Sequence, residues 1–326
     1  MTTLYLIRHA EAEGNAYRRI DGWYNSLVTP NGLRQIAALE RRFAEIPVDA
    51  CYASDLYRTC RTAAAVYVPK QLSLHPDPRL REVHLGRWEN VPFGYLEQFE
   101  PERMQQFNHD IRHWSVEGGE TFDRYTARAL AALREIAEAN AGRTVAVFSH
   151  GCVLRGVQSV LLGGQTPPYC DNTAVSRLTY ENSAFQIDFL NDASHLPPEI
   201  STFERQKWWR KGGEGQDFNM WFRQTGKGCF TSLLRDTPVG HVRFEKAGED
   251  VGEICELELD AAYRGRRLGE QLIGCAVCEL RRAGVRLLTV SVPEAHQAYG
   301  FFRYFGFQPD GARLVRSIEI PKLPET

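Results

Sequence analysis

Two short apolar runs that lead into histidines constrain the fold of this chain more than any other feature. Residues 4–7 are followed by Arg8 and His9, and residues 144–148 are followed, after one serine, by His150. Apolar runs of this length predict strands that are buried on both faces of a sheet. Because open parallel α/β sheets bind ligands beyond the carboxyl ends of their strands, we expect His9 and His150 to meet over one ligand, with Arg8 beside them to bind an anion.

The length and charge of the chain narrow the class of protein. A chain of 326 residues suggests about two domains, and a formal net charge of −2 gives no sign of a nucleic-acid or membrane partner. No apolar stretch is long enough to span a bilayer. The first residues lack the basic and apolar regions of a secretory signal, so we expect a cytoplasmic protein that acts on small molecules.

Eight cysteines are scattered along the chain without the spacing of a disulfide framework. In a chain without an export signal, reduced thiols are the better interpretation. Cys275 and Cys278 form a C-x-x-C, but they fall within an amphipathic helical pattern and have no second pair at zinc spacing. We therefore expect both to pack in a core, and we expect no metal site.

Residues 1–190 alternate strand and helix signals, which is typical of a doubly wound, mostly parallel α/β sheet. Thr29 followed by Pro30 predicts the start of a helix, with the threonine as its N-cap. The expected strands are residues 4–7, 49–53, 144–148, 175–180 and 185–189. The expected helices are residues 30–43, 56–67, 120–140 and 153–162.

The pattern changes after a polar, proline-bearing stretch, which predicts a linker at residues 191–200. Residues 201–326 are expected to form a smaller α+β domain with a mostly antiparallel sheet. Its expected strands are residues 229–234, 240–244, 254–259 and 287–292, and its expected helices are residues 268–283 and 295–305. The stretch from Lys207 to Lys211 mixes tryptophans with cations. We expect it to pack or to line the rim of an acceptor site, and we expect no nucleic-acid partner.

Six segments of the first domain, taken in order, carry a more specific pattern. They are residues 6–15, 21–32, 52–63, 79–89, 118–121 and 148–151. Their order and spacing closely resemble the histidine phosphatase superfamily, which has the phosphoglycerate mutase-like fold. The resemblance covers residues 1–190 and implies that fold for the first domain.

The resemblance also implies a chemistry, in which His9 takes a phosphoryl group covalently. The charge on the phosphoryl oxygens needs fixed positive charge, which arginine supplies. Glu82 would protonate the leaving alkoxide and then activate water. The implied catalytic residues are His9, Glu82, Arg8, Arg58 and His150. The implied substrate-binding residues are Asn15, Gly22 and Gly151, the substrate is a small phosphorylated metabolite, and no metal is implied.

Two reactions share the phosphohistidine step, so a phosphatase and a mutase both remain open. Residues 83–90 resemble the phosphatase branch of the superfamily more than the glycolytic mutases. Asn25 and Asn90 stand where an aspartate and a glycine are common in that branch. These two departures affect the expected local loop geometry and not the expected chemistry. A mutase would return the phosphoryl group to an acceptor instead of releasing inorganic phosphate.

A second pattern lies in residues 263–269, between an expected strand and an expected helix. It resembles the acyl-CoA loop of the GNAT acetyltransferases, whose pattern is R-x-x-G-x-G. Arg264 fits the first position, Gly269 fits the last, and Arg267 stands where the first glycine is expected. Backbone amides at such a helix start bind a pyrophosphate. The implied acetyl-CoA contacts are Leu257, Leu259, Arg264, Gly265, Arg266, Arg267, Leu268 and Gly269.

One departure from that family leaves the second activity open. Phe302 occupies the position of a tyrosine that often acts as general acid, and a phenylalanine cannot donate a proton. Glu256 or Glu258 is the candidate base that accepts the amine proton. The second domain is therefore expected to transfer an acetyl group to a small amine, or else only to bind acyl-CoA as a regulatory or interaction module. In either case, an arginine at position 267 can still expose its backbone amide to the phosphates if its φ is negative.

Overall fold

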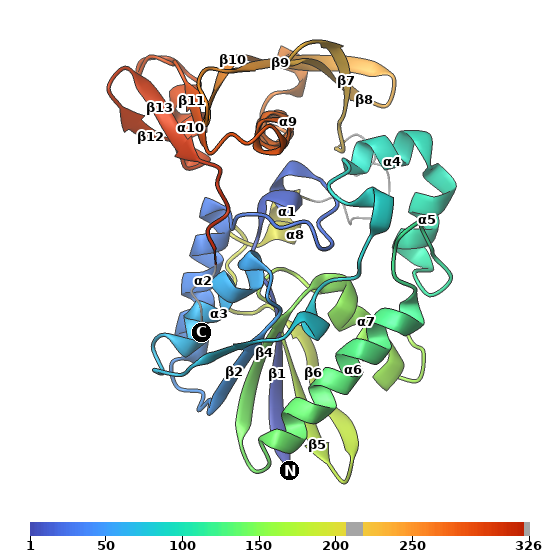
Figure 1. Cartoon of the computed structure of the whole chain (residues 1–326). Coiled ribbons are helices and arrows are strands. Elements are labelled where there is room, and N and C mark those ends of the chain that lie inside the picture. The colour runs from blue at the N-terminus through green and yellow to red at the C-terminus, as the bar shows by residue number, and fades with distance from the viewer. Residues whose placement is uncertain (207–217, 323–326) are drawn as a thin grey trace.

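The computed structural model describes residues 1–206 and 218–322, which fold as two domains (Figure 1). The first domain is built on a six-stranded sheet with the order β3-β2-β4-β1-β5-β6. The parallel strands are β1 (Thr2–Arg8), β2 (Ala50–Ala53), β3 (Leu74–Pro76) and β4 (Thr144–Ser149). The strands that close the sheet in antiparallel pairs are β5 (Val175–Glu181) and β6 (Ala184–Asp192).

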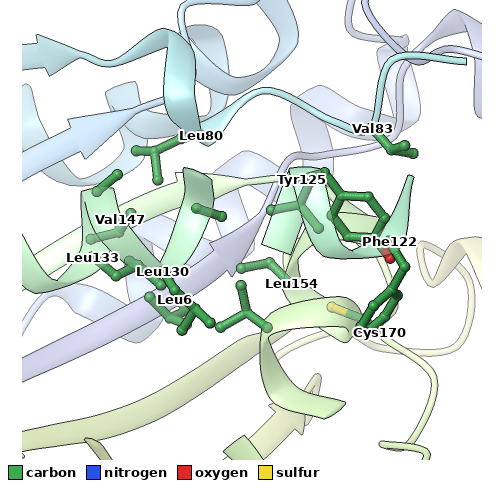
Figure 2. Close-up of a cluster of buried hydrophobic side chains, with 14 of the residues drawn as sticks. Leu6, Leu80, Val83, Phe122, Tyr125, Leu130, Leu133, Val147, Leu154 and Cys170 are labelled. Carbon is green, nitrogen blue, oxygen red and sulfur yellow. The ribbon is translucent and has the colours of Figure 1, made fainter. Parts of the chain in front are cut away.

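Alternate residues of the central strands bury their side chains in two different cores. Leu4 and Leu6 of β1 pack with α6 (Phe122–Ala139) and α7 (Gly151–Leu161), as Figure 2 shows for part of this cluster. Ile7 faces the other way, toward α2 (Pro30–Phe43) and α3 (Tyr57–Tyr67). Helices therefore cover both faces of the sheet, which confirms the doubly wound fold.

The expected elements of the first domain are present with small shifts at their ends. Thr29 caps α2, because its side chain accepts a hydrogen bond from the backbone N–H of Gly32 at 3.0 Å. β3 was not predicted, because it is a strand of only three residues with mostly exposed side chains. The remaining short elements are α1 (Glu13–Tyr17), α4 (Phe93–Phe99), α5 (Pro101–His109) and the 3₁₀ turns at Pro78–Leu80 and Gly86–Trp88.

The second domain has a seven-stranded sheet with the order β12-β13-β11-β10-β9-β8-β7. Its strands are β7 (Trp221–Gly226), β8 (Cys229–Leu234), β9 (Thr237–Lys246), β10 (Val251–Leu259), β11 (Leu287–Val290), β12 (Gln308–Asp310) and β13 (Arg313–Ser317). Among the pairings the structure describes in this sheet, β10 with β11 is parallel and the others are antiparallel. Its helices are α9 (Gly269–Arg282), α10 (Tyr299–Tyr304) and a 3₁₀ turn at Ala261–Tyr263.

The segment between the two domains lies against the first one. After β6 ends at Asp192, Leu196 and Ile200 are buried against Ala38 of α2, and α8 (Thr202–Gln206) follows. The stretch from Lys207 to Lys211, for which packing or an acceptor rim was expected, lies outside the described residues.

Helix α1 of the first domain packs into the second domain, where α9 lies over it (Figure 1). Ala16 and Tyr17 belong to the core cluster of the second domain. Gly274 of α9 gives Tyr17 the room it needs, because a Cβ at that glycine would lie 2.4 Å from the ring. The two domains therefore share a core at α1.

Cys275 and Cys278 are buried on α9, which confirms that they pack in a core. All eight cysteines are free. Among the described residues, no helix is both long and apolar enough to cross a membrane.

Candidate functional site

His9 and His150 follow neighbouring parallel strands, and the structure brings their rings together. Arg8 of β1 stands opposite Ser149 of β4, so each histidine leaves its strand at the same level of the sheet. The ring centroids are 5.1 Å apart. The strand pattern predicted this meeting at the carboxyl edge of the sheet.

The surroundings of His9 fix which of its ring nitrogens is available. Its Nδ1 lies 2.8 Å from the carbonyl oxygen of Ala10, so Nδ1 carries the hydrogen and Nε2 carries the lone pair. Burial, together with the charges of Arg58 and Arg8, holds the pKa of His9 well below its ordinary value of 6.5. The ring is therefore neutral near pH 7, with Nε2 free to act as a nucleophile.

His150 lies deeper than His9 and is fully buried. Its Nε2 is 2.9 Å from the hydroxyl oxygen of Ser54, while its Nδ1 has no partner among the described residues. Burial and the charge of Arg58 hold its pKa well below the ordinary value. His150 is thus a neutral ring beside the nucleophile, with one ring nitrogen left for a ligand.

Two guanidinium groups flank the histidines. Arg8 donates to the carbonyl oxygen of Cys170 at 2.5 Å and lies against Gly151, where a Cβ would be 3.2 Å from the arginine Nε. Arg58 is fully buried and donates to the carbonyl oxygens of the loop at residues 21–24. The Nε atoms of Arg8 and Arg58 are both buried and have no acceptor in the part of the chain that the structure describes, so each has a donor to spare for an anion.

Glu82 is held at the start of α7. Its carboxylate accepts hydrogen bonds from the backbone N–H groups of Cys152 at 3.1 Å and Val153 at 3.0 Å. Arg128 donates to the backbone carbonyl of Glu82 at 2.7 Å, which fixes its main chain. A carboxylate is favoured at a helix N-terminus, and this one also reaches the cavity described next.

A cavity of about 1120 Å³ opens over these groups. Arg8, His9, Asn15, Glu82 and Gly151 line it, while His150 and Arg58 are fully buried beside these groups and are not among its lining residues. The Oδ1 of Asn15 accepts from the Ala12 N–H and the Asn172 amide, so its own amide hydrogens are left for the cavity. Gly22 is not among the described residues that line the cavity, and its carbonyl instead accepts from Arg58.

Sequence reasoning missed several cavity residues. Asp21 lines the cavity, and burial raises its pKa to about 6. Arg18 also lines it and donates to Asn219 of the second domain at 2.8 Å, and that asparagine donates to Glu97 at 2.6 Å. Arg18 follows Asn15 by about one helical turn, a spacing that predicts a shared face, whereas no local signal marks Asn219.

The second predicted site lies where β10 and β11 separate. The two strands pair only as far as Ile254 opposite Val290, and β10 then continues along β9 alone. Leu257 and Leu259 stand on this separated part of β10. Arg264 donates back to the carbonyl of Leu259 at 2.8 Å, and Arg266 lies over the ring of Tyr263. Gly265 has a φ of +73°, Leu268 is buried, and α9 begins at Gly269.

Arg267 has a positive φ of +62°, so the negative φ considered for it is wrong. This left-handed conformation costs an arginine about 1–2 kcal/mol more than it costs a glycine. Its side chain pairs with Glu270, which is buried and lies close enough to Glu11 of the first domain to feel its charge. Burial raises the pKa of Glu270 to about 8.

Phe302 of α10 has no proton to donate, and the hydroxyl of Tyr304 is engaged elsewhere. Phe302 is buried, and the hydroxyl of Tyr304 accepts from Arg34 and Arg205 on the side of the first domain. Phe301 packs over the start of α9, where a Cβ on Gly269 would lie 3.0 Å from its ring. Within residues 1–206 and 218–322 there is no group of three or more His, Cys, Asp or Glu side chains placed to hold a metal ion.

Comparison with known families agrees with both patterns. Residues 4–193 match the profile of the histidine phosphatase superfamily (branch 1), and residues 191–307 match that of the acetyltransferase (GNAT) family. The chain therefore belongs to the histidine phosphatase superfamily, and a GNAT domain follows its phosphatase domain.

Individual relatives support the same assignment. The probable phosphoglycerate mutase GpmB of Yersinia pestis (strain Pestoides F) is 31% identical over 217 residues, which cover 63% of this chain and 100% of the relative. The solved structure of Bacillus stearothermophilus YhfR is 31% identical, with a TM-score of 0.58, and the match covers 60% of this chain and 99% of that one. The α-ribazole phosphatase from Shigella flexneri is 25% identical, with a TM-score of 0.52, over 58% of this chain and 96% of its own.

Proposed function

We propose that the first domain, residues 1–190, hydrolyses small phosphomonoesters through a phosphohistidine at His9. The observation that carries this proposal is the neutral His9 ring, whose Nε2 is free beside two arginines with unpartnered Nε atoms. In the first step Nε2 attacks phosphorus and the bond from phosphorus to the alcohol oxygen breaks. Protonated Glu82 gives its proton to that oxygen, and the alcohol leaves.

The second step returns the enzyme to its starting state. The Glu82 carboxylate takes a proton from water, the water oxygen attacks phosphorus, and the bond from phosphorus to Nε2 breaks. Inorganic phosphate leaves, His9 is neutral again, and Glu82 is protonated for the next cycle. Arg8, Arg58 and His150 bind the phosphoryl oxygens throughout, so these steps need no metal ion.

A mutase is the alternative for the same site, since the relatives' names include both a probable mutase and a phosphatase. A mutase must keep the phosphohistidine away from water until an acceptor takes the group. The cavity here is about 1120 Å³ and extends to Asn219 of the second domain, which favours hydrolysis. Release of inorganic phosphate, measured with and without a monophosphate acceptor, separates the two reactions.

Replacing Glu82 with glutamine is expected to slow hydrolysis of alkyl phosphates by about 10²–10⁴-fold, but to slow nitrophenyl phosphate by less than about tenfold. A nitrophenolate leaves without a proton, whereas an alkoxide does not. The glutamine carbonyl still accepts the amide hydrogens at the start of α7, so the fold is kept. Steady-state kinetics on both esters measure the difference, with Glu117→Gln as the control at an exposed carboxylate. Equal losses on both esters would point to another acid.

We infer that the second domain, residues 201–326, binds acetyl-CoA and transfers the acetyl group to a small amine. The separation of β10 from β11 supports the binding, because it leaves backbone groups of β10 unpaired beside Leu257 and Leu259. Arg243 pairs with Glu256 and lowers its pKa, which leaves Glu258 as the better candidate base. The buried Phe302 favours the alternative, in which the domain binds acyl-CoA without turnover.

Titration with acetyl-CoA is expected to show binding that Gly269→Val weakens by at least about tenfold, since the added methyl groups would collide with Phe301 at the helix start. Gly300→Ala is the matched control, because a Cβ there meets nothing within 4 Å. Thiol release with a panel of amines then tests transfer. Binding without turnover would support the regulatory alternative, and no binding at all would refute both.

We place both activities in the cytoplasm, where thiols stay reduced. The eight cysteines are all free, and five of them are buried in the interior of one domain or the other. Under this proposal, the acyl-CoA and the phosphorylated metabolite are both substrates in the cytoplasm.

A further inference from the structure

Arg155 lies in the cavity wall one helical turn beyond the catalytic groups. Gly151, Cys152, Arg155 and Ser159 of α7 all line the cavity, so one face of the helix is turned toward it. Arg8 rests against Gly151 at the start of this face. Four residues of helix rise about 6 Å, so Arg155 begins about 6 Å farther along the wall than Gly151.

The guanidinium of Arg155 has no hydrogen-bond acceptor among the described residues. Its centre lies 4.8 Å from the ring centroid of Tyr169, another cavity residue, and this contact holds the group in place. Its Nε is buried and unpartnered, and within residues 1–206 and 218–322 Arg155 makes neither a hydrogen bond nor an ion pair. The Nε of Arg8 is in the same condition, and under the proposed function its partner is the phosphoryl group.

The carboxylates that line the cavity are engaged elsewhere. Glu82 accepts from the backbone amides of α7, and Glu97 accepts from Asn219. Asp21 accepts from the backbone N–H of Gly14 and the hydroxyl of Ser26. Asp110 lies 2.8 Å from His113. A second cation also lies on this side, since Arg112 contacts Ser159, one turn beyond Arg155, at 3.4 Å. A partly buried guanidinium without a counter-ion costs free energy, and an anion on the ligand would offset that cost.

We propose that Arg155 binds a second anionic group of the substrate, so that the phosphatase acts on phosphomonoesters that carry another phosphate or a carboxylate. This inference rests on the proposed phosphatase function. Arginine suits either anion, because its planar fork donates two parallel hydrogen bonds to the oxygens of a phosphate or a carboxylate. The spacing along α7 places the two anionic groups several bonds apart in the substrate.

Kinetics on three matched esters test the proposal: propyl phosphate, propane-1,3-diyl bisphosphate and 4-(phosphonooxy)butanoate. The wild-type protein is expected to have a lower KM for at least one of the two esters that carry a second anionic group than for propyl phosphate. Arg155→Met should raise that KM by about 10- to 100-fold and leave kcat/KM for propyl phosphate within about twofold. The ester with the larger change identifies the second anion as phosphate or carboxylate.

Two further variants distinguish an effect of Arg155 on substrate binding from an effect on the fold. Arg155→Lys keeps the charge without the fork and should regain part of the lost affinity. Arg124→Met, at an exposed arginine of α6, should change none of the three KM values. Equal losses on all three esters, or a wild-type protein that prefers neither ester with a second anionic group over propyl phosphate, would overturn the proposal.

Failure of the phosphatase itself is recognised separately. If the wild-type protein hydrolyses none of the esters, the proposed function is wrong, and calorimetric titration with propane-1,3-diyl bisphosphate then tests the anion site directly. Binding that Arg155→Met weakens would support the site, and equal binding by both proteins would refute it.

Discussion

Replacing His9 with alanine is expected to abolish release of phosphate from phosphomonoesters, with a loss in kcat on the order of 10⁴–10⁶-fold. The loss is this large because no other described group can replace Nε2. The ring of His150 is 5.1 Å away, but its Nε2 is engaged by Ser54 and the residue is fully buried. The arginines would still bind the phosphoryl group, so affinity for phosphate should fall much less than turnover.

Rapid mixing with a ³²P-labelled ester, followed by quenching in alkali, measures the intermediate directly. The wild-type protein should carry a label that is stable to alkali and released by acid, and His9→Ala should carry none. His75→Ala is the matched control, since His75 lies on neighbouring β3 with its ring 5.0 Å from that of Tyr52. That variant should keep label and turnover. A label that persists in His9→Ala would assign the nucleophile to another residue.

The two histidines could be paired from sequence because local patterns determined their positions. Side chains that alternate between two cores, such as Leu6 and Ile7, make a strand register unambiguous. Once residues 4–7 and 144–148 are parallel neighbours, the residues that follow them must meet at one edge of the sheet. The nucleophile and its partner were therefore within reach of pattern reasoning.

The far wall of the cavity was not predictable in the same way. Asn219 joins Arg18 and Glu97 only because the second domain packs onto α1 and α4, and no periodicity in the sequence encodes that packing. The position of Arg155 on a helix was predictable. That its buried Nε has no partner among the described residues was not, because this depends on the whole fold.

Arg267 shows a different limit of prediction from sequence. Its place in the loop pattern predicted a backbone role, but its side chain is used at the domain interface with Glu270. A glycine there would have freed the loop for a ligand, whereas the arginine also serves the contact between domains. Comparison with a family pattern detects such a substitution, but only the packing around the residue explains it.

Replacing Glu13 with glutamine is expected to lower the free energy of unfolding by about 3–5 kcal/mol. The Glu13 carboxylate is 2% exposed and receives Arg281 at 2.8 Å and Arg316 at 2.7 Å, both from the second domain. Arg316 also donates to the hydroxyl of Tyr17 at 2.6 Å. Removing the carboxylate charge leaves two guanidinium groups inside the interface with too little negative charge to balance them.

Urea denaturation followed by circular dichroism measures the effect, with Glu279→Gln as the matched control on α9. Glu279 pairs with Arg282 at an exposed position, and such pairs contribute about 0.5 kcal/mol or less. Because α1 also carries Asn15 into the cavity, Glu13→Gln should raise KM for phosphomonoesters as well as lower stability. If Glu13→Gln cost no more than Glu279→Gln, the two domains would not depend on α1 as a shared core. A single unfolding transition for both domains is expected in the wild-type protein, since a helix of the first domain completes the core of the second.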